Sequence, residues 1–284
     1  MYIPLTTANK FSSSFSEGKA MLFKVSFYRA VIGAAIGAVI LMFGEKNYSI
    51  NKTMLFSSAL FGINIAVCTV MSYLAYQHTT VTVNALFAAA SVIIPTIFGV
   101  IWFDEPFNFY ICIGFVCFIS AMGLIVSNKS EENKTKFSSV AFFACLGVFL
   151  TSGFGSVSMQ IFSKTADNGN VNMFMFFSYV FDAAFALLFY LIAAKKEKNG
   201  NKQKMDLKNF VLCVIGMGAA FFIQALQTNL ADRISGSLLF PVVSGSSVII
   251  SAVVGFLIFG EKLSLKNVMG ILLGIISLCV IGLN

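Results

Sequence analysis

Long apolar runs, separated by short hydrophilic stretches, occupy most of the sequence. Each run is close to the roughly 20 residues that an α-helix needs to cross a bilayer. A backbone in lipid must satisfy its own hydrogen bonds, so runs of this length and apolarity are predicted to be helices. The pattern predicts complete spanning helices over approximately 22–43, 54–76, 81–103, 109–127, 138–160, 172–194, 209–230, 235–259 and 266–283.

Part of this pattern occurs twice. Residues 91–105 read SVIIPTIFGVIWFDE and residues 247–261 read SVIISAVVGFLIFGE, so seven of fifteen positions are identical at an offset of 156 residues. The same offset, without a gap, also pairs Leu74 with Leu230, Ala75 with Ala231, Gly114 with Gly270, Ile119 with Ile275 and Ile125 with Ile281. The repeated unit therefore covers three helices rather than one.

The hydrophilic stretch at 127–136 divides the chain into two halves. If each half holds five helices, the odd number makes the second half enter the membrane upside down, an arrangement typical of secondary transporters. The predicted fold class is an all-α integral membrane protein with two inverted repeats of five transmembrane helices. The repeats are expected at residues 1–127 and 138–284, with a linker at 128–137.

The first helix of the first repeat is shorter than its counterpart. Its polar end is expected at residues 9–18, with only eight residues before it. The sequence thus predicts nine complete helices and a shortened first one. A half-helix leaves backbone groups unsatisfied in lipid, which favours a translation start upstream of Met1 over a functional stub.

Composition agrees with a membrane protein and argues against an enzyme. The chain is 58% hydrophobic and 11% charged, whereas soluble domains are about a quarter charged. It has one histidine and no cluster of acids or histidines, so we expect no catalytic residues, no metal and no cofactor. The net charge of +7 comes from lysines near the helix ends, which predicts contact with anionic lipid of the bilayer and not with nucleic acid.

Several motifs together resemble one family. The chain resembles the EamA family of the drug/metabolite transporter superfamily in four places. Two are the segments FGEKLSLKNVMGILLGIISLCVIG at 259–282 and FDEPFNFYICIGFVCFISAMGLI at 103–125. The other two are the NK that ends the first helix and Arg29 early in the next helix. The most specific element is a helix-end glutamate with a glycine nine residues later. It occurs as Glu105 with Gly114 and as Glu261 with Gly270.

The resemblance implies a multi-pass, ten-helix permease of the inner (plasma) membrane, often an exporter of amino acids or other small metabolites. The chain departs from the family pattern in its shortened first helix and in Asp104, where glycine is usual. A lipid-carrier flippase on the same fold and a transport-inactive scaffold stay open as alternatives, as does a homodimer. Orientation is also open, because the lysine-rich loops predict one direction and the resemblance implies the other.

Polar residues within the apolar spans are the candidate substrate contacts, since lipid would otherwise exclude them. Asn84 and Ser91 share one helical face, and the offset of 156 places Ser244 and Ser247 on the matching face of the other repeat. The predicted midplane cavity between the repeats is lined by Asn64, Asn84, Ser91, Ser152, Ser156, Gln160, Gln224, Ser244 and Ser247. The alternative is that these residues join helices, at about 0.6 kcal/mol per contact.

Four charged residues are considered separately. Asp182 is the one carboxylate predicted within a span; it is a candidate for a coupled proton, or a neutral acid near water. Arg29 is a candidate for binding a substrate carboxylate, although a side chain that reaches the interface is favoured. Glu105 and Glu261 each follow a helix C-terminus, which predicts capping or gating at opposite membrane faces rather than catalysis.

Overall fold

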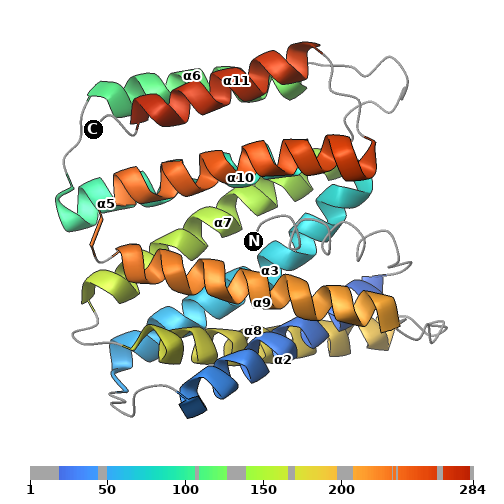
Figure 1. Ribbon diagram of the computed structural model, residues 1–284. Helices are drawn as coiled ribbons and strands as arrows, with labels where there is room; N and C mark the ends of the chain where they lie inside the picture. The colour runs from blue at the N-terminus through green and yellow to red at the C-terminus, as the bar shows by residue number, and fades with distance from the viewer. Residues whose placement is uncertain are drawn as a thin grey trace. The chain divides into compact units, whose positions relative to one another are not determined.

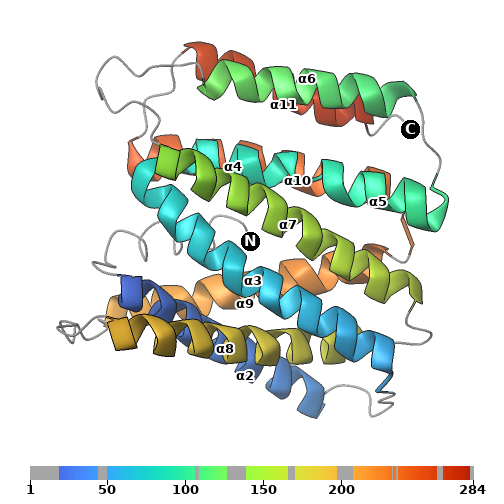
Figure 2. The same ribbon diagram turned by 180° about the vertical axis from the view of Figure 1, so that it is seen from behind.

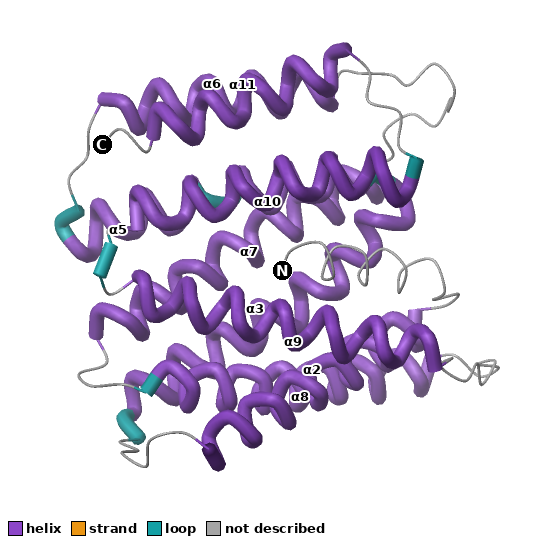
Figure 3. Tube along the Cα trace, in the orientation of Figure 1, coloured by secondary structure: helices purple, strands orange, loops and turns teal. Residues whose placement is uncertain are grey.

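The computed structural model describes residues 19–43, 50–105, 109–126, 139–165, 170–196, 207–231, 233–234, 236–260 and 265–281. All regular structure within these ranges is helical (Figure 3), which confirms the all-α prediction. The shortened first helix and Glu261 lie outside the described residues.

The helices fall where the apolar runs predicted them. Their bounds are α2 Lys19–Phe43, α3 Lys52–His78, α4 Val81–Ala90, α5 Ile93–Phe103, α6 Phe109–Val126, α7 Ser139–Thr165, α8 Val171–Lys196, α9 Leu207–Ala231, α10 Gly236–Phe259 and α11 Leu265–Ile281. Six described segments are long and apolar enough to cross a membrane: Phe23–Phe43, Lys52–His78, Val83–Phe103, Ser139–Thr165, Val171–Lys195 and Val214–Ala231. Val242–Ile258 and Val268–Ser277 are shorter apolar helices.

One predicted helix differs from expectation, because the span at 81–103 consists of α4 and α5 with a break at Ser91 and Val92. Pro95 explains the break: a proline has no N–H to donate to the carbonyl four residues earlier, here Ser91, and its ring clashes with that carbonyl. The backbone tightens instead, and the Ile94 N–H donates to the Ser91 carbonyl at 3.0 Å.

The chain forms two compact units. Unit 1 comprises Met1–Tyr73 and Ser158–Asp232, and unit 2 comprises Leu74–Val157 and Arg233–Asn284. Each unit therefore combines helices from both sequence halves. The predicted repeats at 1–127 and 138–284 divide the chain by sequence similarity, whereas the two units divide it by contacts. The repeat boundaries therefore stay a prediction.

Helices that occupy equivalent places in the two halves pack against each other. In unit 1, α2 lies along α8 and also contacts α9 (Figure 1). In unit 2, α6 lies along α11, and α4 and α5 lie against α10, as Figure 2 shows from behind. Each of these pairs joins one helix from before the linker with one from after it.

The repeat is visible in the backbone of unit 2. α5 ends at Phe103 and α10 ends at Phe259, and the next residue of each, Asp104 (φ 51°) and Gly260 (φ 61°), is left-handed. Asp104 donates its N–H to the Gly99 carbonyl, which closes α5. At an offset of 156 residues, the two segments therefore share the position of the helix end and a left-handed cap residue. That residue is aspartate in the first segment and glycine in the second.

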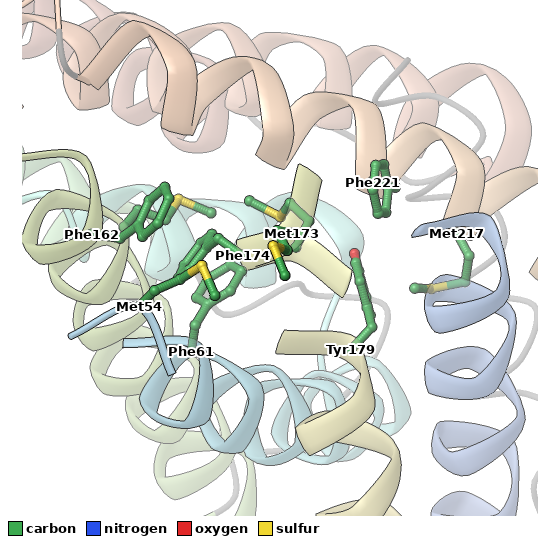
Figure 4. Packing of buried hydrophobic residues seen from close by; sticks show 10 residues of the cluster. Met54, Phe61, Phe162, Met173, Phe174, Tyr179, Met217 and Phe221 are labelled. Atoms are coloured by element: carbon green, nitrogen blue, oxygen red, sulfur yellow. The ribbon is translucent and has the colours of Figure 1, made fainter. Parts of the chain in front are cut away.

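The two units have cores of different composition. In unit 1 the cluster is rich in methionine and aromatic rings, and comprises Met54, Phe61, Met159, Phe162, Met173, Phe174, Met175, Tyr179, Met217 and Phe221 (Figure 4). Within it, the rings of Phe162 and Phe174 stack with centroids 4.2 Å apart. In unit 2 the buried cluster is mostly aliphatic: Leu86, Ala89, Ala90, Val92, Phe240, Val248 and Ile271.

Candidate functional site

A polar cluster of buried and partly buried side chains lies in unit 1, and we call it the unit 1 polar cluster. Its members come from four helices: Arg29 from α2, Tyr73 from α3, Tyr179 and Asp182 from α8, and Gln224 from α9. α2 and α3 belong to the first half of the sequence, and α8 and α9 to the second. The cluster is therefore built where the two halves meet inside one compact unit.

Arg29 is held inside the protein. It lies about 15 Å along α2 from the start of the helix, and its side chain is only 9% exposed. Its Nη1 donates to the Tyr73 hydroxyl at 2.8 Å, and its guanidinium carbon lies 5.8 Å from the centroid of that ring. Its Nε donates to the Met217 thioether at 3.3 Å. The side chain of Arg29 is therefore held by protein partners, and its position relative to the membrane interface stays a prediction.

Asp182 lies in the middle of α8 and is 3% exposed. Its carboxylate interacts electrostatically with Arg29 and with Tyr179. Its Oδ1 has no hydrogen-bond partner among the described residues. A buried carboxylate oxygen without a donor is costly, so this atom is suited to a proton, a water molecule or a ligand.

Tyr179 connects Asp182 to α9. Its hydroxyl donates to Gln224 Oε1 at 2.7 Å, and its ring stacks on Phe221 with centroids 5.8 Å apart. α8 begins at Val171, about two turns before Tyr179, where the Asn170 side chain accepts the N–H groups of Asn172 and Met173 at 2.9 and 3.3 Å. Tyr73 and Tyr179 were not among the predicted site residues.

Two glycines let the neighbouring helices approach α8. A Cβ at Gly33 of α2 would lie 2.6 Å from the Tyr179 ring, and a Cβ at Gly62 of α3 would lie 2.5 Å from the Ser178 carbonyl oxygen and 2.9 Å from the Asp182 nitrogen. Real Cβ atoms do not approach so closely. These glycines therefore fix the positions of Tyr179 and Asp182 against α2 and α3.

Two other predicted cavity residues lie in unit 1. Gln160 of α7 is fully buried, and neither its Oε1 nor its Nε2 has a hydrogen-bond partner in the described structure. Asn64 of α3 is partly buried and donates from Nδ2 to the Leu60 carbonyl at 2.7 Å. Gln160 thus keeps its full hydrogen-bonding capacity, whereas Asn64 uses part of it within its own helix.

The remaining predicted cavity residues lie in unit 2. Asn84 is 3% exposed, and its Oδ1 has no partner in the described part of the chain. The serines bond to their own helices: Ser91 donates to the Ala88 carbonyl, Ser156 to that of Ser152, and Ser247 to that of Ser244. Such local bonds are ordinary for serine in a helix. A cavity lined by these residues stays a prediction.

Glu105 caps a helix other than its own. It is 7% exposed, and its Oε1 accepts the N–H of Gly236, the first residue of α10, at 3.2 Å. The N-terminus of a helix favours a negative charge. The expected capping role therefore has a physical basis at Glu105.

The described residues hold no group of three or more His, Cys, Asp or Glu side chains that could bind a metal ion. Among the cysteines whose side chains the structure describes, none forms a disulfide: Cys68, Cys112, Cys117, Cys145 and Cys279.

Comparisons with known proteins agree with this fold. Residues 138–283 match the profile of the EamA-like transporter family. The multidrug resistance protein EbrA of Bacillus licheniformis is 35% identical over 74 residues, which cover 26% of this chain and 68% of that protein. One crystal structure superposes with a TM-score of 0.67 over 99% of this chain and 93% of the other, at 15% identity, a likeness that concerns the fold alone.

Proposed function

Since the chain belongs to the EamA-like transporter family and is a multi-pass protein of the cell membrane, we propose that it is a secondary active transporter. It exports a small metabolite, such as an amino acid, by alternating access. The observation that carries this proposal is the unit 1 polar cluster, in which a buried arginine and a buried carboxylate meet among helices from both sequence halves. Charged residues buried within membrane helices commonly mark transport pathways.

Substrate binds at the unit 1 polar cluster in this proposal. Arg29 supplies a fixed positive charge with several donors, and Gln224 and Tyr179 supply neutral polar groups. Because these groups come from helices of both sequence halves, a movement of one half relative to the other changes the site. This is the property that alternating access needs.

Asp182 couples transport to protons in this proposal. Its buried carboxylate lies near Arg29 and has one oxygen without a donor, so a proton and a substrate compete for the same surroundings. A proton bound at Asp182 on one side of the membrane and released on the other would drive substrate in the opposite direction. The multidrug resistance named for EbrA favours export as that direction.

A ligand screen is the first test of the proposed function. Purified protein is heated with amino acids, nucleosides, sugars and polyamines, because a ligand that binds only the folded state raises its stability, by about 2.7 kcal/mol at a hundredfold excess over Kd. A positive compound is then tested for transport in proteoliposomes with an imposed pH gradient. Binding without gradient-driven transport would contradict the proposal.

Asp182→Asn tests the coupling. Asparagine keeps the size of the side chain and removes the titratable proton, so transport driven by a pH gradient should stop, while substrate still binds with an affinity that no longer changes with pH. A carboxylate introduced by Asn64→Asp should not restore coupling to Asp182→Asn, because Asn64 lies on α3 and Asp182 lies on α8. An unchanged dependence of transport on pH would remove Asp182 from the mechanism.

A lipid-carrier flippase and a transport-inactive scaffold are the alternative functions. The flippase predicts that scrambling of a labelled polyprenyl phosphate in proteoliposomes depends on the protein, while water-soluble compounds give no thermal shift. The scaffold predicts neither activity from a well-folded protein.

A further inference from the structure

Gln160 of α7 is a fully buried amide whose side chain makes no hydrogen bond to any described residue. It is 0% exposed, and both its Oε1 and its Nε2 lack a partner in the described part of the chain. Its backbone carbonyl, by contrast, accepts from the Ser163 hydroxyl at 3.2 Å. Buried polar groups nearly always have partners, because burial removes their hydrogen bonds to water. The amide of Gln160 therefore destabilises the protein as it stands.

Gln160 lies beside the methionine-rich cluster of unit 1. Phe162, two residues later on α7, belongs to that cluster and stacks on Phe174 of α8. Figure 4 shows Phe162 at one end of the cluster and Met217 at the other. Met217 contacts Arg29 of the unit 1 polar cluster. The methionine-rich cluster thus extends from the neighbourhood of Gln160 to the unit 1 polar cluster.

We propose that Gln160 binds a neutral group of the substrate that carries a hydrogen-bond donor beside an acceptor, such as a carboxamide. A glutamine side chain offers one acceptor oxygen and two donor hydrogens, so a second carboxamide pairs with it through two parallel hydrogen bonds. Binding then supplies the partners that the amide lacks. The inference rests on the proposed function and adds a second polar contact for its substrate, outside the unit 1 polar cluster.

A neutral group suits the surroundings of Gln160 better than an ion does. An ion that leaves water needs a counter-charge as well as hydrogen bonds, and an amide supplies only the hydrogen bonds. Met159 and Phe162, which flank Gln160 on α7, are buried and apolar. Methionine side chains are flexible and adapt to irregular shapes. The methionine-rich cluster can therefore accommodate the apolar part of a molecule whose carboxamide is held by Gln160.

Two substitutions and two matched pairs of neutral compounds test the inference. Gln160→Met removes the amide at similar length and volume. Asn229→Met is the control, because it removes an exposed amide of unit 1 whose Nδ2 donates to the Ala225 carbonyl at 3.0 Å. The compounds are benzamide with acetophenone and isovaleramide with isobutyl methyl ketone. In each pair the ketone has a methyl group in place of the amide nitrogen, so it keeps the acceptor and loses the donors.

The first measurement is the melting temperature of the purified protein without any compound. Gln160→Met should melt about 5 °C above the wild type, because a buried amide without partners is replaced by an apolar side chain of similar size. Asn229→Met should leave the melting temperature unchanged. A lower melting temperature in Gln160→Met would show that protein or a buried water already satisfies the amide, and would overturn the inference.

The second measurement is binding of the compounds, by thermal shift and by the 15N NMR signal of the Gln160 side-chain amide, which is identified by its absence from Gln160→Met. At least one carboxamide should bind the wild type about tenfold more tightly than its matched ketone and should move this signal. In Gln160→Met the affinity for the carboxamide should fall to that for the ketone, while Asn229→Met keeps the difference. Equal affinities in the wild type, or no binding of either carboxamide, would overturn the inference.

The proposed function is judged separately, by gradient-driven transport. A protein that transports a compound equally well with and without the Gln160 amide keeps the function and refutes the role of Gln160. A protein that binds a carboxamide through Gln160 but transports nothing keeps the binding site and refutes the function.

Discussion

The helix pair α4–α5 and the helix α10 have similar sequences at an offset of 156 residues but different backbones. They share the pattern SVII, the helix end and the left-handed cap residue at an offset of 156. Even the serine contacts are repeated, since Ser91 donates to the carbonyl of Ala88 and Ser247 to that of Ser244. The first copy is nevertheless two helices and the second is one.

The difference can be attributed to a single residue. Pro95 interrupts the first copy at Ser91, and the equivalent position in the second copy is Ser251, within a helix that runs from Gly236 to Phe259. The similar sequences thus form helical segments at equivalent places and of nearly equal length. The proline in the first segment accounts for its interruption. If the two copies exchange conformations during transport, they do so from unequal backbones.

The largest loss of stability is expected when α10 receives a proline at the equivalent position. Ser251→Pro removes the N–H that a continuous helix donates to the Ser247 carbonyl, and it should destabilise the protein by about 3 kcal/mol. Denaturation of the purified protein in mixed detergent micelles measures this loss. Pro95→Ser is the reciprocal variant and should cost less than Ser251→Pro, while slowing hydrogen exchange around Ser91. Equal costs for the two variants would show that Pro95 does not cause the break.

Gly153→Ala tests what packs against the broken copy. A Cβ at Gly153 of α7 would lie 2.5 Å from Cδ1 and 2.8 Å from Cβ of Ile94, which follows the break. Overpacking at such a contact should cost about 2 kcal/mol. Ile94→Ala should recover part of the loss in the double variant. Gly218→Ala is the matched control, since a Cβ there meets nothing within 4 Å; a loss of similar size in both would contradict the contact.

The caps are compared by exchanging their residues. Asp104→Gly should stabilise the protein by about 1 kcal/mol, because glycine adopts the left-handed conformation without steric cost, and Gly260→Asp should destabilise it by a similar amount. Apparent melting temperatures of both variants measure the two effects. Shifts in the same direction would show that the two caps are not equivalent.

The smallest effect is expected at the start of α10. Glu105→Gln keeps an acceptor for the Gly236 N–H but removes the negative charge, which should cost about 0.5 kcal/mol. Glu105→Ala removes the acceptor as well and should cost more, about 1.5 kcal/mol. Stabilities measured at low and high salt separate the charge from the hydrogen bond. A glutamine variant as unstable as the alanine variant would assign the whole effect to charge.

The spans were predictable because a bilayer imposes one length and one hydrogen-bonding solution on every crossing. The break at Ser91 is a local effect of Pro95 and was readable from the sequence, although the prediction treated 81–103 as one helix. Which helices share a compact unit was not readable, because contacts such as Arg29 with Met217 join residues far apart in the chain.

The candidate site was predicted in part. Arg29, Asp182 and Gln224 are unusual residues for apolar spans, and the structure connects them within unit 1. Tyr73 and Tyr179 were not predicted because tyrosine is common in membrane helices, and only packing shows that their hydroxyl groups face polar partners. Polar residues at helical spacing identify one face of a helix, but they do not indicate which neighbouring helix packs against that face.

The assembly of each unit from both ends of the chain bears on biosynthesis. Asp182 follows Arg29 by 153 residues, so the ribosome delivers the arginine to the membrane long before its counter-charge exists. α2 must wait in the bilayer, or in the insertion machinery, until α8 and α9 emerge. Translation speed through the chain between α2 and α8 thereby acts on how long an unmatched positive charge is exposed to lipid.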